Sequence, residues 1–227
     1  MPNQHTKIIA ALCGFILIEI LLVVFVDRPL ALFVHDLDTT HHQLIDFFRA
    51  YTDLGKSKWY LWPCGLAVLA FAFLARGKDV PARYRHLCSY VGSRALFLFA
   101  TIGLSGIATD ILKPLIGRAR PIEFLHDNIY AAQPFSFAAR WNGFPSGHAT
   151  TAFALAVSLS LLYPRLRMLW LALGITLAAS RVMVDAHYVS DTVAGSLVGF
   201  LTVQAIHQYG MVHIARIFPI DDPTPPR

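Results

Sequence analysis

The sequence predicts an all-α integral membrane protein, a single domain of residues 1–227 built as a bundle of about six transmembrane helices. Three observations favour this class: 56% of the residues are hydrophobic, only 15% are charged, and the mean hydropathy is +0.52. Soluble domains carry about 25% charged residues, so a soluble globular fold is disfavoured. The apolar residues are also gathered into runs of a length that suits helices crossing a bilayer.

The charge and the cysteines exclude other classes. The formal net charge is +5, but the basic residues fall in loops between apolar runs and form no single basic face, so we expect no nucleic-acid partner. Cys13, Cys64 and Cys88 are scattered, without a CxxC pair or metal-ligand spacing. We therefore expect free thiols, with no disulfide framework, no zinc site and no cofactor.

The first apolar run, residues 8–26, is close to the ~20 residues that a membrane-spanning helix needs. A signal peptide is the alternative, but the run is long for one, contains Glu19 and precedes no clear cleavage site. Five further runs follow, and the last three are shorter than a full span, which fits motif residues continuing those helices near one membrane face. Their predicted ranges are 59–74, 95–112, 149–163, 168–184 and 193–206.

Two polar segments complete the layout. In residues 27–58 the sequence HQLIDFFRAY places Leu44, Phe47, Phe48 and Tyr51 on one helical face. This pattern predicts a short helix that either lies in the membrane interface or packs on the bundle. The proline-rich end, residues 219–227, is predicted to be disordered.

The basic residues predict an orientation. With the N-terminus in the cytoplasm, six crossings place the basic loops 76–85 and 165–167, and the C-terminus with Arg216, on the cytoplasmic side. Residues 113–148 and the segment around His187 then lie together on the external face, which is periplasmic in a bacterial inner membrane.

Three polar clusters stand at the ends of apolar runs: KPLIGRARP at 113–121, FPSGHATT at 144–151 and SRVMVDAHYVSD at 180–191. A buried cation, hydroxyl or imidazole costs several kcal/mol unless it is paired or used. Recurrence of such residues at three helix ends therefore predicts one shared polar site.

The third cluster has the most constrained spacing. His187 and Asp191 are four residues apart, so we expect Asp191 to accept a hydrogen bond from the imidazole on one helical turn. A carboxylate in that position fixes the tautomer of a nucleophilic histidine. Arg181 lies at the same membrane end, and its planar guanidinium suits a phosphate oxygen.

The second cluster places Ser146, Gly147 and His148 at the start of a helix, just after Pro145. Backbone N–H groups are unpaired there and bind anions, and the glycine permits close approach. We expect His148 to donate a proton to a leaving oxygen.

The first cluster adds two cations, Lys113 and Arg120. Asp110 is placed to pair with Lys113 three residues later, whereas Arg118 matches no motif position and is expected to be solvated. Three cations, a helix N-terminus, a hydroxyl and two histidines fit a phosphoryl group better than a carboxylate or a sugar. Four residues border the site and could reach a lipid headgroup: Lys56, Lys58, Arg140 and Trp141.

Three patterns occur in order: Lys, six residues, Arg-Pro; then PSGH; then Ser-Arg, five residues, His, three residues, Asp. This arrangement closely resembles the type 2 phosphatidic acid phosphatase family, membrane lipid phosphatases related to vanadium haloperoxidases. The resemblance implies that His187 forms a phosphohistidine, that Asp191 orients it, and that His148 acts first as acid and then as base. It also implies a metal-free reaction and five groups that bind the phosphate: Lys113, Arg120, Ser146, Gly147 and Arg181.

The expected substrate is a membrane lipid with a terminal phosphate or diphosphate. Undecaprenyl diphosphate, phosphatidylglycerophosphate, phosphatidic acid and lipid A phosphates remain open, because recognition lies in loops 27–58 and 122–142, whose sequences carry no readable code. Alternatives are a lipid-to-lipid phosphotransferase with the same site, a non-catalytic transporter of phospholipids or anions, and a structural membrane protein with an inactive site. The sequence predicts no oligomeric state.

Overall fold

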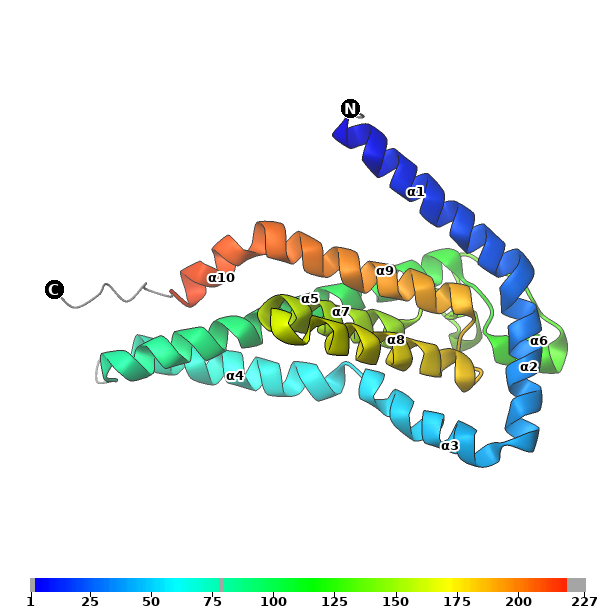
Figure 1. Ribbon diagram of the computed structural model, residues 1–227, viewed down its shortest axis with the longest axis horizontal. Helices are drawn as coiled ribbons and strands as arrows, with labels where there is room; N and C mark the ends of the chain where they lie inside the picture. Colours follow the sequence, from blue (N-terminus) through cyan, green and yellow to red (C-terminus); the bar gives the residue numbers. More distant parts are fainter. Residues whose placement is uncertain (1–2, 78–79, 220–227) are drawn as a thin grey trace.

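A computed structural model describes residues 3–77 and 80–219, and it confirms the predicted all-α class (Figure 1). In these residues the backbone forms helices and no β-strand, apart from one isolated bridge between Arg118 and Ala132. From residue 220 onward, the predicted disordered tail lies outside the described residues.

The prediction of about six membrane helices is also confirmed. Five helical segments are long and apolar enough to cross a membrane, and a sixth apolar helix, α7 (Gly147–Leu162), is shorter at 16 residues. The protein is therefore an integral membrane protein. The five long segments are Thr6–Thr40, His42–Arg76, Arg83–Ile116, Pro164–Met183 and Val189–Ile217.

Helix α7 forms the centre of the bundle. It packs against α5 (Ala82–Ile116), α8 (Arg167–Met183) and α9 (Val189–Ala205), while α4 (Lys58–Arg76) packs along α5 (Figure 1). Nine of its residues are buried, and all nine are Ala, Ser, Thr or Val, whose small side chains let neighbouring helices approach closely. Because other helices surround α7 on several sides, its sequence needs no polar face.

Helix α5 is much longer than its apolar run predicted. The expected range was 95–112, but the helix has 35 residues and begins at Ala82. Residues 82–94 mix charged and apolar residues and contain no proline, so they form a helix that begins after Pro81 and runs on into the apolar segment. A helix of this length measures about 50 Å, more than the ~30 Å hydrocarbon core of a bilayer.

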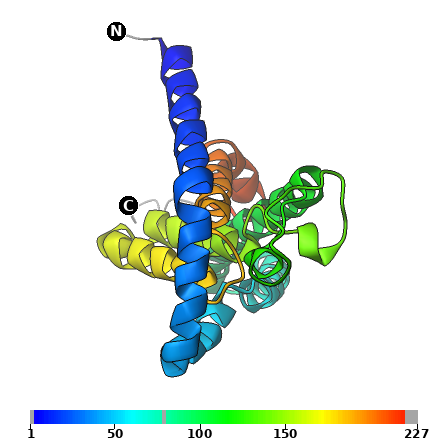
Figure 2. The same cartoon turned by 90° about the vertical axis from the view of Figure 1, so that its right-hand side faces the viewer.

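The N-terminal part lies across one end of the bundle. Helix α1 (Gln4–Leu21) passes through a π-helical turn (Leu22–Val26) into α2 (Asp27–Thr40), which is followed by α3 (His42–Tyr51). Figures 1 and 2 show α1 diverging from the bundle toward the N-terminus and α2 crossing the bundle end.

The predicted amphipathic helix is confirmed as α3. It buries Ile45 in the protein and leaves Leu44 and Phe47 exposed, while the Tyr51 hydroxyl lies 2.8 Å from Thr176 Oγ1 of α8. Apolar side chains that face outward beside a membrane bundle are typical of a helix at the interface.

Short elements complete the chain: the 3₁₀ turns Thr52–Gly55, Ala139–Trp141 and Pro164–Leu166, α6 (Pro121–Asp127), the π-turn Ile206–Gly210 and α10 (Met211–Ile217).

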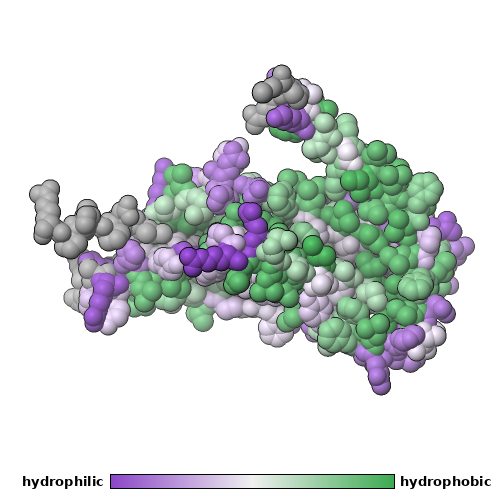
Figure 3. Space-filling view, in the orientation of Figure 1, coloured by the Kyte–Doolittle hydropathy of each residue, from purple (hydrophilic) through white to green (hydrophobic). Residues whose placement is uncertain are grey.

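The two ends of the bundle carry different kinds of residues. Helix α4 ends at Arg76 and α8 begins at Arg167, at the bundle end opposite the three motif clusters. Figure 3 shows hydrophobic side chains over the right half of the molecule and hydrophilic ones at its right-hand edge, beside α2.

Candidate active site

The three motif clusters meet at one end of the bundle, where α5 and α8 end and α7 and α9 begin. Hydrogen bonds join them directly. The Ser146 amide donates to the Asp191 carbonyl at 2.9 Å, and His187 Nδ1 lies 2.7 Å from the Gly143 carbonyl oxygen. Arg118 Nη1 donates to Asp191 Oδ1 at 2.7 Å. Residues far apart in the sequence thus form a single polar site.

His187 is held in the short turn between α8 and α9. Asp185 in this turn has φ of +52°, a left-handed conformation that Asp tolerates better than most residues, and its carboxylate lies 3.5 Å from His35. Burial lowers the pKa of His187, and the Arg181 and Arg120 charges add to this effect against the opposing influence of Asp191. The imidazole is therefore neutral at neutral pH.

The contact at Nδ1 also determines the tautomer of His187. A carbonyl oxygen can only accept, so the hydrogen bond to Gly143 places the proton on Nδ1. The lone pair of the neutral ring is then on Nε2, the nitrogen available to attack an electrophile.

The contact between His187 and Asp191 is slightly longer than the predicted hydrogen bond. Asp191 Oδ2 lies 3.6 Å from His187 Nδ1, because α9 begins only at Val189 and the two residues do not share a helical turn. That oxygen accepts instead from the Tyr188 amide at 2.8 Å. The carboxylate remains near enough to stabilise an imidazolium ion by charge.

The predicted phosphate ligands present unused donors. Arg181 Nη1 donates to Thr52 Oγ1 at 2.9 Å, but the Nε atoms of Arg181 and Arg120 are buried and find no partner among residues 3–77 and 80–219. Both guanidinium groups lie near enough to His187 to influence its charge. Buried donors without partners are costly, and an anion between these two arginines would satisfy them.

Lys113 approaches the start of α7. As predicted, its ammonium pairs with Asp110, at 3.6 Å, and a side chain on Gly147 would begin 3.4 Å from the same nitrogen. Ser146 is the N-cap of α7 and is completely buried, so the first-turn amides of this helix face the same region. A cation and a helix N-terminus therefore converge where the sequence predicted them.

A cavity of about 300 Å³ opens beside these groups. It is lined by His148, Lys113 and Gly147, and by Lys56 and Lys58, which sequence analysis placed at the border of the site. The His148 ring packs on Gly55, where an added Cβ would lie 2.9 Å from it. His148 lines this cavity, whereas His187 does not and is buried.

The residues that form this site lie within the part of the chain that matches a known protein family. The family model described as the PAP2 superfamily matches residues 94–214, which is more than half of the chain and includes all three clusters. The chain belongs to the PAP2 superfamily. This finding confirms the resemblance that the motifs indicated.

Two relatives and one solved structure are similar to this PAP2 protein. A lipid A 1-phosphatase of Rhizobium etli is 40% identical over 65% of this chain, but the match covers only 63% of that relative's length, less than two thirds. The bacitracin transport permease protein BcrC of Bacillus licheniformis is 30% identical over 70% of this chain and 76% of its own. A crystal structure of a PAP2 type phosphatidylglycerolphosphate phosphatase from Bacillus subtilis has a similar fold, with a TM-score of 0.55 at 18% identity, covering 87% of this chain and 94% of that chain.

The PAP2 motifs did not indicate the role of Arg118, and the expectation that it is solvated is wrong. Its side chain is only 11% exposed, and its two terminal nitrogens contact Asp191 and Asp27, both 2.7 Å away. Burial lowers the pKa of Arg118, but the Asp191 and Asp27 carboxylates outweigh this effect and raise it overall. Two fully buried carboxylates require a counter-charge, and Arg118 supplies it.

Two glycines of this PAP2 site were also missed. An added Cβ on Gly195 would lie 2.4 Å from the Ser146 carbonyl oxygen, and one on Gly199 would lie 2.5 Å from the Thr150 carbonyl oxygen. The sequence does carry a signal for them, because GSLVG is a small-xxx-small pattern that lets membrane helices pack closely. Gly195 thereby sets the distance between α9 and the N-cap of α7.

Proposed function

We propose that this PAP2 protein is a lipid phosphate hydrolase that works through a phosphohistidine intermediate on His187. The observation that carries the proposal is the pairing of a buried, neutral His187 with two arginines, Arg120 and Arg181, whose buried Nε donors have no protein partner among the described residues. A nucleophile beside unused cationic donors is the arrangement that phosphoryl transfer requires.

The reaction proceeds in two steps. In the first, His187 Nε2 attacks phosphorus, the bond from phosphorus to the lipid oxygen breaks, and protonated His148 gives its proton to that oxygen. In the second, His148 takes a proton from water, the resulting hydroxide attacks phosphorus, and the bond to Nε2 breaks to release inorganic phosphate. Asp191 supports the positive charge on His187 during both steps.

The cations stabilise the charge that develops on the phosphoryl oxygens. Lys113, Arg120 and Arg181, together with the amides at Ser146 and Gly147, would contact these oxygens. Fixed donors of this kind are worth about 2.7–4 kcal/mol each in transition-state stabilisation. The residues supply all the steps named here, and we propose a reaction without a metal ion.

We propose lipid A carrying a 1-phosphate as the first substrate to test. The relative from Rhizobium etli, with 40% identity, is named a lipid A 1-phosphatase, which supports this choice. Lys56 and Lys58 line the cavity beside His148 and suit an anionic sugar headgroup at the membrane surface. Phosphatidylglycerophosphate, phosphatidic acid and undecaprenyl diphosphate are the competing substrates.

We also propose that the site faces the periplasm from a bacterial inner membrane. Arg76, Arg165 and Arg167 are at the bundle end opposite the motifs. Basic loops stay on the cytoplasmic side, so this distribution favours cytoplasmic termini and an external site.

The deciding experiment measures phosphate release by detergent-purified protein from the four lipids, with EDTA present. We expect release by wild type, none by His187→Ala, and wild-type rates for the control His213→Ala, which removes an exposed histidine of α10. Release that persists in folded His187→Ala would contradict the nucleophile. Loss of release in EDTA, restored by a divalent ion, would contradict the metal-free reaction.

The same preparations separate hydrolysis from its alternatives. With radiolabelled substrate, the acid-labile label of a phosphohistidine should appear on wild type and not on His187→Ala. Movement of phosphate to an added acceptor lipid, without release to water, would identify a phosphotransferase. Binding of lipid phosphate with neither reaction would favour the transporter.

A further inference from the structure

We propose that Arg118 is a positioning residue that fixes the His187 turn to the bend in the first membrane helix. This inference rests on the proposed function, since it concerns the same nucleophile. In this arrangement the junction of α1 and α2 is part of the catalytic machinery, although it lies about 160 residues before His187 in the sequence.

The guanidinium group of Arg118 divides its donors between two parts of the protein. Nη1 donates to Asp191 Oδ1 at 2.7 Å and to the Ser190 hydroxyl. Nη2 donates to Asp27 Oδ2 at 2.7 Å and to the Tyr130 hydroxyl at 3.1 Å. The first set belongs to the start of α9 and the second leads to the N-terminal helix. A planar fork of this kind fixes both distance and angle.

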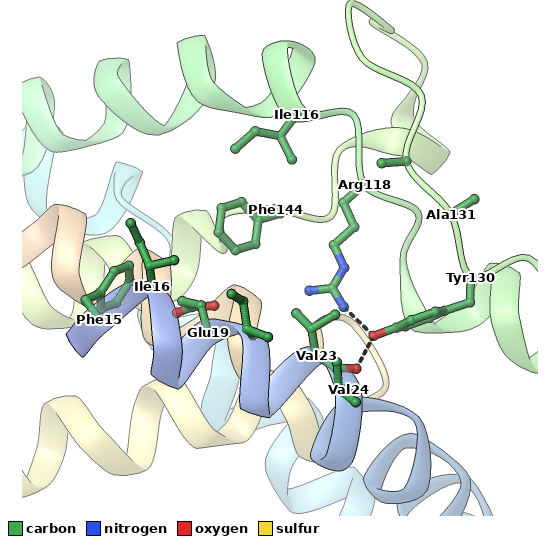
Figure 4. Close-up of a pocket in the computed structure, with 12 residues that line it drawn as sticks. Phe15, Ile16, Glu19, Val23, Val24, Ile116, Arg118, Tyr130, Ala131 and Phe144 are labelled. Carbon is green, nitrogen blue, oxygen red and sulfur yellow. Dashed lines mark hydrogen bonds between the residues drawn. The ribbon is translucent and has the colours of Figure 1, made fainter. Parts of the chain in front are cut away.

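The helix side of the connection is anchored at the π-helical turn. Figure 4 shows Arg118 reaching toward this turn, with the Tyr130 hydroxyl between its guanidinium and Val23. Tyr130 donates to the Val23 carbonyl at 2.7 Å, and Asp27 also accepts from the Ser190 amide at 3.1 Å. π-turns are common at functional sites. Here the loop that carries Arg118 and Tyr130 is attached to the bend at two residues, Val23 and Asp27.

On the side of the active site, Arg118 holds two residues that lie next to the nucleophile, Tyr188 and Asp191. Arg118 Cζ lies 4.4 Å from the centre of the Tyr188 ring, and Tyr188 directly follows His187. Asp191, fixed through Oδ1 by Arg118, uses Oδ2 to hold the Tyr188 amide. Movement of Arg118 would therefore shift Tyr188 and Asp191 together, and with them the ring of His187.

Stability alone is a poor reason for this cluster. Replacing a buried ion network by apolar residues of similar volume is often neutral or stabilising, so burial of one guanidinium with two carboxylates needs another use. A largely apolar cavity of about 460 Å³ borders Arg118 on the α1 side, lined by Phe15, Val24 and Phe144 together with Glu19 (Figure 4). Arg118 thus borders this cavity, while its Nη1 donates to Ser190 and Asp191 next to the catalytic turn.

The protein contains a matched control for this network. Arg49 also bridges two carboxylates, Asp38 at 2.6 Å and Asp46 at 2.8 Å, but its side chain is 51% exposed. Its partners lie in α2 and α3, and in the described part of the chain neither forms a hydrogen bond or ion pair with His187. Arg49→Met removes the same type of bridge without removing a contact to His187.

Two variants separate charge from geometry. Asp27→Asn removes one of two buried negative charges while keeping the side-chain shape, and the remaining Arg118 and Asp191 still balance each other, so we expect a folded protein. Arg118→Lys keeps the charge, but a single ammonium cannot span both carboxylates as the fork does. Both should lower kcat by about 10-fold to 100-fold, the cost typical of small misplacements, with KM changed by less than about 2-fold.

The pH profile separates positioning from general damage. The charged groups facing His187 are Asp191 of α9, Arg181 of α8, Arg120 before α6 and His148 of α7. Asp27→Asn removes negative charge behind Asp191, which destabilises the imidazolium, so the acid limb of kcat/KM should move to lower pH. Arg118→Lys retains the charge, so its acid limb should stay in place.

The measurement is kcat, KM and the acid limb for wild type, Asp27→Asn, Arg118→Lys and Arg49→Met on one lipid substrate, with melting temperatures alongside. The inference is supported if Asp27→Asn and Arg118→Lys lose kcat, only Asp27→Asn shifts the limb, and Arg49→Met behaves as wild type. An active wild type with unchanged kcat in folded Asp27→Asn and Arg118→Lys overturns the inference alone. An inactive wild type overturns the proposed function, and the positioning role with it.

Discussion

Arg118 and Arg120 are two residues apart in the polar cluster 113–121, yet the protein uses them in opposite ways. Arg118 directs both terminal nitrogens to protein partners, namely Asp27, Asp191, Ser190 and Tyr130. Arg120 is near His187, but its buried Nε has no partner in the described part of the chain. One guanidinium is satisfied by the fold, and the other retains a donor for a ligand.

This difference separates stability from function within a single loop. A satisfied buried cation supports the fold, and its removal leaves carboxylates unpaired. A buried donor without a partner destabilises the fold, and its retention is expected where a substrate supplies the missing partner. The two arginines should therefore respond differently to the same substitution.

Arg120→Met should produce the largest loss of activity. Removal of a donor to the transferring phosphoryl group should reduce kcat/KM by about 10²-fold to 10³-fold. The melting temperature should stay the same or rise, because the variant removes a buried Nε donor that has no partner in the described part of the chain. Phosphate release and thermal unfolding of the same preparations measure both effects.

Arg118→Met is the contrasting variant for that test. It leaves Asp27 and Asp191 buried without a counter-charge, which costs about 3–5 kcal/mol in typical cases, so its melting temperature should fall. If Arg120→Met were the less stable of the two, the assignment of one arginine to the fold and one to the ligand would be wrong.

Much of the fold could be predicted from the sequence because apolar runs report membrane helices directly. The predicted and observed central helices agree closely, for example 168–184 against Arg167–Met183 of α8. The run 95–112 under-predicted α5, since hydropathy cannot detect a helix that continues outside the apolar region. The motif order placed His187, His148 and the cations at one end of the bundle, as the structure does.

What the sequence could not indicate were contacts made across long separations. Arg118 meets Asp27, 91 residues earlier, and no local pattern marks that pair. Spacing alone suggested a helical hydrogen bond between His187 and Asp191, but the helix begins between them, at Val189. The Gly143 carbonyl, which fixes the tautomer, is a backbone group and has no signature in residue type.

Gly195→Ala should have the next largest effect, by moving the N-cap that belongs to the ligand-binding side of the site. The new Cβ would lie 2.4 Å from the Ser146 carbonyl oxygen, so the backbone at the start of α7 must shift. A misplacement of this size should reduce kcat by about 10²-fold. Gly14→Ala in α1, where an added Cβ meets nothing within 4 Å, is the control. Equal activity of the two variants would show that the Ser146 position is not critical.

The pH dependence of wild type tests the neutral state of His187. Its pKa lies below the ordinary 6.5, so the nucleophile stays deprotonated as the pH falls to that value. Protonation of His187 below its pKa removes the lone pair on Nε2, so kcat/KM should fall at low pH. The rate is measured from pH 5 to 9 on a lipid whose own phosphate ionisation is determined separately. An acid limb well above 6.5 that follows His187 would contradict this assignment.

The smallest effect is expected at Arg140, which sequence analysis placed beside the site. This arginine is a third case for the comparison: its side chain is 46% exposed and pairs with Glu123 on α6, while Asp127 lies 3.5 Å away. Hydrogen bonding to Glu123 raises the pKa of Arg140, but exposed ion pairs contribute little to stability or to distant chemistry. Arg140→Met should therefore change kcat by less than about 2-fold and leave the melting temperature almost unchanged. A larger rise in KM, with kcat preserved, would instead show that Arg140 contacts the lipid headgroup, because a group that binds ground state and transition state equally affects KM alone.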